Sequence, residues 1–308
     1  MPGIGIDVSK AMLDVAIHGQ PGLQRYPNTP AGIRRLLRML GKLVDARVVV
    51  ESTGGYESAV TDACAEAGLW IARINPRQGR DFARATGQLA KTDALDAGVL
   101  AEMATVFHAR LRPYQAPPAW QAELKAWLRR RQQVRDALQR TNQQWDLAIP
   151  ALRPLMRATL AALRKEMKAI DAQLATLTKA HATPALKSAK GLGPVFQTTA
   201  LALLPELGRL SRKEIAKLVG VAPLNKDSGQ LQGKRRIYGG RADMRIALYM
   251  STLTAVRWEP DLRDHYQQLR ARGKVAKVAL VACMRKLLGI LNARRRDELL
   301  AESAGVFA

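Results

Sequence analysis

Cysteine and histidine are scarce in this chain, and each shortage excludes a kind of site. The 308 residues include two cysteines, Cys64 and Cys283, which lie far apart in helix-like apolar patterns. Because such cysteines are ordinarily buried as free thiols, the sequence predicts no disulfide framework. Four histidines occur singly along the chain without the spacing of metal ligands, so we expect no zinc site.

Long apolar runs are missing as well. No apolar run approaches the ~20 residues that a membrane-spanning helix requires. The N-terminus also lacks the basic and then apolar segment of a signal peptide. We therefore expect a cytoplasmic protein that has no membrane-spanning segment.

Acidic residues are outnumbered by basic ones. Lysine and arginine total 49 against 26 aspartates and glutamates, which gives a net charge of +23 and a pI of about 10.7. Such a chain repels itself unless a polyanion neutralises it. Nucleic acid is the predicted partner, which would place the protein at the nucleoid; a membrane surface is the alternative that charge alone allows.

The first hundred residues alternate between strand and helix patterns. Short apolar runs predict strands at 3–9, 13–18, 23–28, 47–51 and 70–74, and helical periodicity predicts helices at 30–41, at 56–67 and from 76. Hairpin strands followed by alternating helices and strands give a mixed-sheet α/β domain. The strand at 47–51 is apolar on both sides until Glu51, as expected of a central parallel strand.

Four acids are predicted to meet at one edge of this sheet. Asp7 lies in the first strand and Glu51 ends the 47–51 strand, while Asp93 and Asp96 share one face of a helical pattern. If the two strands are parallel neighbours and the helix crosses their ends, the four carboxylates form a cluster suited to two Mg²⁺ ions. Taken singly, Asp7 and Glu51 are ordinary strand-end acids.

Several segments, taken in order and spacing, resemble the insertion-sequence one-ten family of DEDD transposases, which are now understood as bridge-RNA-guided recombinases. The segments are GIDVSK at 5–10 with LDVA at 13–16, ESTGGYE at 51–57, NPR at 75–77 with DFARA at 81–85, and KTD at 91–93 with Asp96. The resemblance implies an RNase H/RuvC-like domain whose four acids match Asp7, Glu51, Asp93 and Asp96. It also implies a noncoding bridge RNA that pairs with donor and target DNA, and homodimers that join into a tetramer.

Two long helical patterns follow from residue 113. The first runs from Trp120 to Ile149, and the second repeats apolar residues three and four apart from Leu160 to Leu177, which predicts a coiled-coil seam. The seam fits an intramolecular antiparallel pair and an intersubunit one equally well. The predicted division is a RuvC-like domain at 1–112, a helical arm at 113–183 and a mainly helical C-terminal domain at 184–308.

The C-terminal part carries a second set of motifs. The turn Lys190-Gly191-Leu192-Gly193-Pro194 can offer free amides to a phosphate or simply join two helices. By itself Ser228, which precedes a glycine, is an ordinary turn residue. The family resemblance extends to this region and implies that Ser228 is a nucleophile that forms a phosphoserine link to DNA, in cis or in trans. One departure is that Tyr238-Gly239-Gly240-Arg241 lacks the expected Lys-x-Gly.

The predicted function is DNA transposition guided by a bridge RNA. Two alternatives remain: a metal-dependent endonuclease similar to Holliday-junction resolvases, which uses water at the same acids, and a non-catalytic transposase relic that binds nucleic acid. In the triplet Arg129-Arg130-Arg131, a solvated helix face is the ordinary interpretation. The residues predicted to contact nucleic acid are Arg77, Arg80, Arg84, Lys91, Arg129, Arg130, Lys190, Gly191, Gly193, Lys234, Arg235 and Arg236.

Overall fold

The chain forms two compact units, Met1–Pro117 and Pro118–Ala308, and each is described by itself. The computed structural model describes all residues except 89–92, 226, 229–230, 233–234 and 306–308, and it gives the backbone alone for 93–95, 227–228 and 231–232. Two predicted nucleic-acid contacts, Lys91 and Lys234, lie outside the described residues. Within the described part of the chain, no helix is long and apolar enough to cross a membrane.

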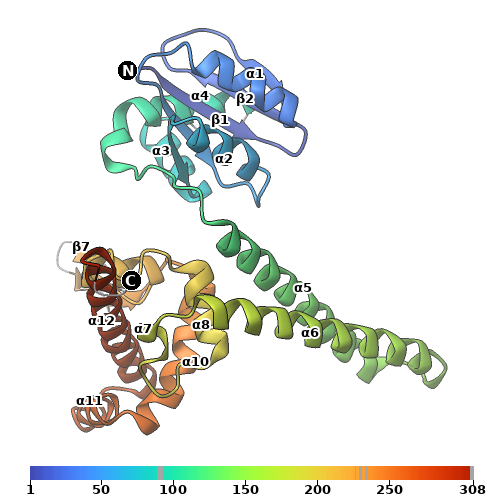
Figure 1. Ribbon diagram of the computed structural model, residues 1–308, viewed down its shortest axis with the longest axis vertical. Helices are drawn as coiled ribbons and strands as arrows, with labels where there is room; N and C mark the ends of the chain where they lie inside the picture. The colour runs from blue at the N-terminus through green and yellow to red at the C-terminus, as the bar shows by residue number, and fades with distance from the viewer. Residues whose placement is uncertain (89–92, 226, 229–230, 233–234, 306–308) are drawn as a thin grey trace. The chain divides into compact units, whose positions relative to one another are not determined.

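The first unit is built on a five-stranded mixed sheet (Figure 1). Its strands lie in the order β3-β2-β1-β4-β5; β1, β2 and β3 are antiparallel neighbours, and β4 and β5 continue the sheet parallel to β1. This arrangement confirms the predicted mixed α/β sheet and is consistent with an RNase H/RuvC-like fold. The elements are β1 (Gly3–Val8), β2 (Met12–Ile17), β3 (Gln24–Pro27), α1 (Pro30–Leu40), β4 (Arg47–Glu51), α2 (Ser58–Glu66), β5 (Trp70–Ile74), α3 (Pro76–Ala85), α4 (Asp93–Phe107) and the short 3-10 helix η1 (His108–Arg110).

The two faces of this sheet have different coverings. Side chains alternate along each strand, so Ile4 and Ile6 of β1, with Val48 of β4, pack into the apolar core that α1 and α2 cover. Val49 points the other way and packs with Leu100 of α4. The face under α4 is therefore the one that receives every second residue of β1, starting from Gly3.

Glycine allows α4 to lie directly on β1. A Cβ atom at Gly5 would come 2.0 Å from the carbonyl oxygen of Ala97 and 2.4 Å from the amide nitrogen of Ala101. These are backbone atoms of a helix that cannot shift alone, so any side chain at this position forces α4 away from the sheet.

Gly5→Ala is therefore expected to destabilise the protein by about 3 kcal/mol, because overpacking against backbone is costly. Gly98→Ala on α4 is the matched control, since a Cβ atom there meets nothing within 4 Å. Alanine at a helix interior stabilises by about 1 kcal/mol relative to glycine. Thermal unfolding followed by circular dichroism should show a lower midpoint for the first variant and an equal or higher one for the second. Equal midpoints would contradict this close approach.

The second unit is mainly helical. Its helices are α5 (Ala119–Leu147), η2 (Pro150–Leu152, a 3-10 turn), α6 (Arg153–His181), α7 (Pro184–Lys187), α8 (Pro194–Leu203), α9 (Arg212–Val219), α10 (Ala242–Trp258), α11 (Pro260–Ala271) and α12 (Ala276–Ser303). Four two-residue strands form two small ladders between α9 and α10: β6 (Pro223–Leu224) pairs with β9 (Arg236–Ile237), and β7 (Asp227–Ser228) pairs with β8 (Leu231–Gln232). One apolar core joins the arm helices to the C-terminal helices.

The helical arm is an antiparallel pair within the chain (Figure 1). Leu160, Ile170 and Leu174 of the predicted seam are buried, and Ile170 and Leu174 share an apolar cluster with Leu124 and Val134 of α5. Of the two arrangements that the sequence leaves open, the intramolecular one is observed. Assembly into dimers and tetramers stays a prediction.

Ion pairs cross the same arm. The Nε atom of Arg130 donates to Glu166 at 2.6 Å, and that of Arg131 donates to Asp171 at 2.6 Å. Arg130, predicted to contact nucleic acid, is thus engaged with the neighbouring helix, whereas Arg129 is exposed. The acids that engage Arg130 and Arg131 are on α6, which the local pattern around the three arginines does not reveal.

Both cysteines are free and buried, as predicted. Burial raises the pKa of the Cys64 thiol to about 12 and that of Cys283 to about 11. Since the thiolate is the reactive form, these side chains are inert at neutral pH.

Candidate functional site

Asp7 and Glu51 lie side by side on the face of the sheet that α4 covers. The parallel ladder between β1 and β4 pairs the residues immediately before them, so Asp7 and Glu51 are the next pair in register. Two positions earlier, Gly5 and Val49 both face α4. Because side chains alternate along a strand, Asp7 and Glu51 point to that same face.

The first turn of α4 lies at the same end of the sheet. Gly3 lies against Ala101 and Thr105, and Gly5 against Ala97 and Ala101. Each step of two residues along β1 therefore moves about one turn toward the start of α4, and the next step brings Asp7 to its first turn. That turn begins at Asp93 and includes Asp96, which is half-buried.

This placement brings the elements that carry all four predicted acids to one end of the sheet. Only the backbone of Asp93 is described. Among the side chains that the structure does describe, no three histidine, cysteine or acidic groups lie close enough to hold a metal ion. The metal-binding role of Asp7, Glu51, Asp93 and Asp96 stays a prediction.

Helix α3 packs close to Glu51. A Cβ atom at Gly79 would lie 3.0 Å from the Oε2 atom of Glu51, so a glycine here permits the close approach. The opposite side of α3 exposes Arg77, Arg80 and Arg84, which are spaced to share one helix face. Three predicted nucleic-acid contacts thus lie on the helix that packs against a predicted catalytic acid.

Asp14 is a site residue that the sequence did not identify. It pairs directly with Asp7 across the β1–β2 ladder and is only 7% exposed. The Nε atom of Arg25, its cross-strand neighbour on β3, donates to Asp14 at 2.9 Å. A row of charged residues, Arg25, Asp14, Asp7 and Glu51, therefore crosses four strands. Like charges placed directly opposite repel, and the arginine offsets part of that repulsion.

A buried acid holds the loop that follows Glu51. The Oε2 atom of Glu57 accepts from the backbone N–H groups of Thr53 at 3.1 Å and Gly55 at 2.8 Å, and Arg73 lies 3.7 Å from its other oxygen. Burial opposes ionisation of this carboxylate, whereas the backbone hydrogen bonds and the charge of Arg73 favour it. Together they hold the pKa of Glu57 below its ordinary value.

Glu57→Gln should destabilise the protein at neutral pH by about 1–3 kcal/mol, because charge-assisted hydrogen bonds to a buried carboxylate are lost. A carboxylate whose pKa is depressed by folding contributes stability above its unfolded pKa and loses it as the pH falls through the folded value. The difference between wild type and variant should therefore shrink below about pH 4. Denaturant unfolding from pH 7 to pH 3 measures this difference in the free energy of unfolding. Glu66 on α2 is exposed, so Glu66→Gln serves as the control. A difference that is constant across this range would rule out the charge of Glu57 as the cause.

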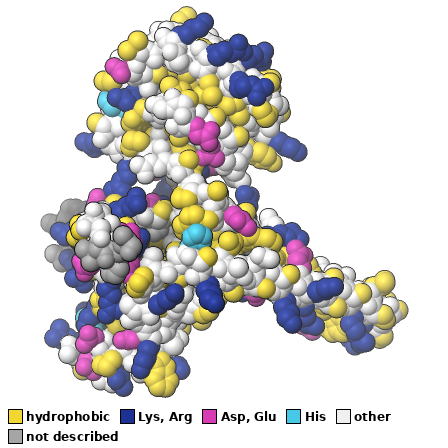
Figure 2. Space-filling model, in the orientation of Figure 1, with side chains coloured by type: hydrophobic (Ala, Val, Ile, Leu, Met, Phe, Trp, Pro, Cys, Tyr) yellow, Lys and Arg dark blue, Asp and Glu magenta, His cyan; other side chains and the backbone are white. Residues whose placement is uncertain are grey.

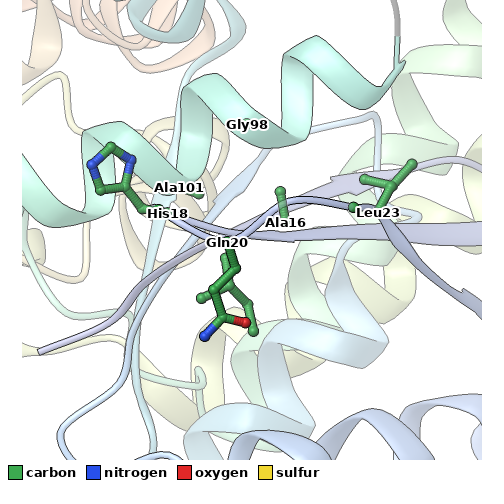
Figure 3. Close-up of a pocket in the computed structure, with 9 residues that line it drawn as sticks. Ala16, His18, Gln20, Leu23, Gly98 and Ala101 are labelled. Atoms are coloured by element: carbon green, nitrogen blue, oxygen red, sulfur yellow. The ribbon is translucent and has the colours of Figure 1, made fainter.

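A hollow of about 360 Å³ opens beside α4, next to the turn between β2 and β3 (Figure 3). It is lined by Ala16, His18, Gln20 and Leu23 on the sheet side and by Gly98 on α4. Ala16 is two residues beyond Asp14 on the same strand, so the hollow continues the face that carries the acids.

Ser228 lies in a β-hairpin of the second unit. In the inner ladder Ser228 pairs with Leu231, and in the outer ladder Leu224 pairs with Arg236. The two ladders place the serine backbone beyond the base of the hairpin. Its side chain is outside what the structure describes, and its role as a nucleophile stays a prediction.

The base of this hairpin is fixed to the helices around it. Both Nη atoms of Arg241 donate to the carboxylate of Glu206 at 2.6 Å, and Nη1 also donates to the carbonyl oxygen of Leu203. Burial opposes ionisation of Glu206, but Arg241 more than compensates and lowers its pKa. A Cβ atom at Gly240 would lie 2.3 Å from the amide nitrogen of Gly220. The Gly-Gly-Arg segment that departs from the family pattern therefore anchors the serine hairpin.

The glycine turn before α8 is packed into the protein. Gly191 has a φ of +95°, and a Cβ atom there would lie 2.8 Å from the amide nitrogen of Ala255. The amide of Lys190 donates to the carboxylate of Glu259, while Gly193 precedes the first residue of α8. The structure gives this turn a role in joining helices, and its contact with phosphate stays a prediction.

Positive side chains are spread over the surface. Lysine and arginine side chains form scattered patches on the visible face in Figure 2 and are more frequent there than the acidic side chains. Arg235 and Arg236, next to the serine hairpin, are both exposed. The described surface therefore suits a polyanionic partner.

Comparison with known proteins assigns the family. One family model, described as a transposase of the DEDD IS110 type, matches residues 4–154, and a second, described as "Transposase IS116/IS110/IS902 family", matches residues 183–267. This chain belongs to the IS110 family of transposases. The family that the sequence motifs indicated is thereby confirmed. The first match covers most of the first unit and continues into the helical arm, and the second lies in the C-terminal part of the second unit.

Relatives of this IS110-family chain are similar over different lengths. It is 30% identical over 164 residues to the IS110 uncharacterized 43.6 kDa protein of Streptomyces coelicolor, covering 51% of this chain and 39% of that one. It is 28% identical over 216 residues to the IS900 uncharacterized 42 kDa protein of Mycobacterium paratuberculosis, covering 63% and 53%. The chain thus spans about half the length or less of these two relatives. The pilin gene-inverting protein of Moraxella lacunata is 22% identical over 318 residues and 93% of both chains.

Among solved structures, this IS110-family chain is similar to RuvC of T. thermophilus in complex with a Holliday junction substrate. The match is 18% identical, covers 37% of this chain and 99% of that one, and has a TM-score of 0.30. A likeness this weak carries no argument about fold or function.

Proposed function

We propose that this chain is a DNA transposase that breaks and rejoins phosphodiester bonds. The observation that supports this proposal most directly is the pair Asp7 and Glu51, adjacent on the α4 face and close to the first turn of α4. Carboxylates grouped in this way repel one another, and a bound cation would offset that repulsion. Relatives of nearly equal length are named for inverting a pilin gene, which is a DNA rearrangement.

The donor set suits divalent metal ions. Carboxylate oxygens are the ligands that Mg²⁺ prefers, and Asp7, Glu51, Asp93 and Asp96 would hold two such ions. Bound Mg²⁺ supplies positive charge that stabilises the attacked phosphate and the leaving oxygen. The protein's own contribution is to hold Asp7 and Glu51 on rigid strands and to hold the following loop through Glu57.

In this mechanism Ser228 is the nucleophile. Its Oγ atom gives up a proton and forms a bond to phosphorus, while the bond from phosphorus to the sugar oxygen breaks and that oxygen takes a proton. A hydroxyl of the other DNA strand then attacks the phosphoserine in the reverse sense and releases Ser228. Each phosphodiester bond that is lost is matched by one that is formed, so no energy source is consumed.

Guidance by a noncoding bridge RNA belongs to the same proposal. Base pairing between RNA and DNA would select the sites, and the protein would grip the backbones with its lysines and arginines. The net charge of +23 supports this division of roles. Homodimers that join into a tetramer would bring donor and target DNA together.

One incubation tests the proposal. Purified protein, Mg²⁺, the flanking noncoding RNA and DNA that carries the element junction are combined, and a covalent protein–DNA band is sought on a denaturing gel. A band that requires Mg²⁺ and RNA is the expected result. DNA cleavage without a band would instead support an endonuclease that uses water, and binding without either would support a non-catalytic relic.

A further inference from the structure

A cationic hollow lies between the start of α9 and the middle of α12, and none of its lining residues belongs to the motifs that the sequence analysis singles out. Its volume is about 430 Å³, and its lining includes Arg212, Lys286, Gly289, Asn292, Ala293 and Arg296. Three of these residues are positively charged, and none of the described residues that line the hollow is acidic. The rim is thus cationic, and the floor consists of small and apolar side chains.

The hollow is built by specific hydrogen bonds. Asn292 on α12 accepts from the backbone N–H of Gly208 at 2.8 Å and donates to the carbonyl oxygen of Leu210 at 2.9 Å, although it is only 2% exposed. The Nη2 atom of Arg296 donates to the same carbonyl at 2.7 Å. These bonds fix the loop that leads into α9, and with it the position of Arg212, the first residue of α9.

Gly289 lets Arg212 lie across α12. A Cβ atom at Gly289 would lie 3.0 Å from the Nε atom of Arg212 and 3.6 Å from its Cγ and Cδ atoms. Glycine is unfavourable in the interior of a helix, because it gives up more backbone freedom than alanine. Its presence in the middle of a 28-residue helix is explained by the room that the arginine side chain takes.

Two of the cationic groups at the hollow are held by backbone carbonyls, which carry no net charge. The Nζ atom of Lys286 donates to the backbone oxygen of Asp261 at 2.9 Å, and Arg296 likewise donates to backbone carbonyls. The acid in the first turn of α9, Glu214, accepts from the backbone N–H of Ser211 as part of a capping box. Neutral carbonyls orient cationic groups but leave their charge available to an anion.

The same positive field acts on a neighbouring side chain. Burial lowers the pKa of His265, and the charges of Lys286 and Arg272 lower it further. The smaller part of this shift comes from Lys286 and Arg272, which agrees with the positive charge that the lining residues place on this side of α12.

We propose that this groove binds the phosphodiester backbone of a nucleic acid. Guanidinium and ammonium groups of Arg212, Lys286 and Arg296 would contact phosphate oxygens, and the sugar would pack on Gly289 and Ala293. Described side chains here offer no aromatic surface for bases, so the contact is independent of sequence. This inference rests on the proposed function for the identity of the ligand, and it adds a grip site that the motifs do not contain.

The test is the salt dependence of binding. Arg212→Gln with Lys286→Gln removes two charges from the rim and leaves Arg296, which holds the loop. Kd is measured by fluorescence anisotropy on a short DNA duplex and on an RNA hairpin, without Mg²⁺, over a range of salt. The slope of log Kd against log salt should fall by roughly 2 on the duplex, because each lost phosphate contact contributes about 0.9. Lys165→Gln with Lys168→Gln, exposed on α6, changes the net charge equally and should leave the slope nearly unchanged.

A second variant keeps every charge and fills the space. Gly289→Leu should weaken binding several-fold at constant net charge, while its thermal unfolding midpoint stays at or above that of wild type. Weaker binding to the DNA duplex, to the RNA hairpin or to both supports the groove. The nucleic acid whose Kd rises is thereby identified as the ligand. The groove is not a binding site if the salt slope of the Arg212→Gln, Lys286→Gln variant falls no more than that of the α6 control. The same conclusion follows if Gly289→Leu binds nucleic acid with the wild-type Kd. An equal loss of affinity for polyglutamate would overturn the assignment to phosphodiesters.

The outcome is separable from that of the proposed function. These measurements need neither Mg²⁺ nor Ser228, so a missing covalent adduct with a reduced salt slope would reject strand transfer and keep the groove. An adduct together with an unchanged salt slope would support strand transfer and reject the groove.

Discussion

Ser228→Ala should yield no covalent protein–DNA product while it binds RNA and DNA as tightly as wild type. The hydroxyl group is all that the substitution removes, and no other group in the proposed reaction can form the bond to phosphorus. Removal of a nucleophile commonly lowers turnover by at least ~10⁴-fold. The amount of adduct that remains would be too small to detect on a gel. Binding, measured on the same preparation, should be unaffected because the alanine leaves the charge of the hairpin unchanged.

Two controls show that the loss is specific to this hydroxyl. Ser303→Ala removes an exposed hydroxyl that donates to the carbonyl oxygen of Leu299, and it should retain the adduct. Asp227→Asn changes the neighbouring residue of the same short strand and should also retain the adduct, since it leaves the Ser228 hydroxyl in place. A Ser228→Ala protein that still forms an adduct would reject the serine nucleophile. Cleavage without an adduct in wild type and variant alike would favour water as the attacking group.

Asp7→Asn should abolish DNA strand breakage and leave the fold intact. Loss of one metal ligand removes several kcal/mol of charge stabilisation from the transition state, which corresponds to a fall of about 10³-fold or more in rate. Asp7 lies opposite Asp14 and beside Glu51, so a neutral side chain reduces repulsion among acids in the metal-free protein. The thermal unfolding midpoint without divalent cations should therefore equal or exceed that of wild type.

Metal binding distinguishes this prediction from a structural effect. Added Mg²⁺ or Mn²⁺ should raise the unfolding midpoint of wild type, because a ligand that binds only the folded state stabilises it, and should raise that of Asp7→Asn much less. Asp81→Asn on the exposed side of α3 removes a carboxylate 3.6 Å from Arg77 and should behave as wild type in both assays. If Asp7→Asn unfolds at a much lower temperature, the aspartate is structural. Full activity in this variant would reject the acid site.

Much of the first unit could be predicted from the sequence. Alternating apolar residues located all five strands to within about two residues, because burial on one face imposes a period of two. The same reasoning placed Asp7 and Glu51 as neighbours, since the carboxyl ends of adjacent parallel strands meet at one edge. The loop after β4 was visible as a motif, but its residues alone did not single out Glu57 as the one that holds it.

Contacts between distant segments required the structure. Asp14 has the pattern of an ordinary strand residue, and only the register of β1 on β2 places it opposite Asp7. The arginine triplet on α5 looked like a solvated or nucleic-acid-binding face until α6 brought Glu166 and Asp171 against it. Register and pairing depend on long-range packing, which local periodicity does not encode.

The sequence by itself determined the charge, the mixed sheet, the four candidate acids and the family of this protein, because each of these is written in composition or in short-range spacing. The tertiary structure alone decided which residues meet. It joined Arg25 and Asp14 to Asp7 and Glu51 in one row and anchored the Ser228 hairpin through Arg241. It also placed the side chain of Arg212 against Gly289, where the two residues line the cationic groove. Such meetings arise from the close packing of helices and strands that are far apart along the chain, where each side chain is fixed by neighbours that the local sequence does not contain.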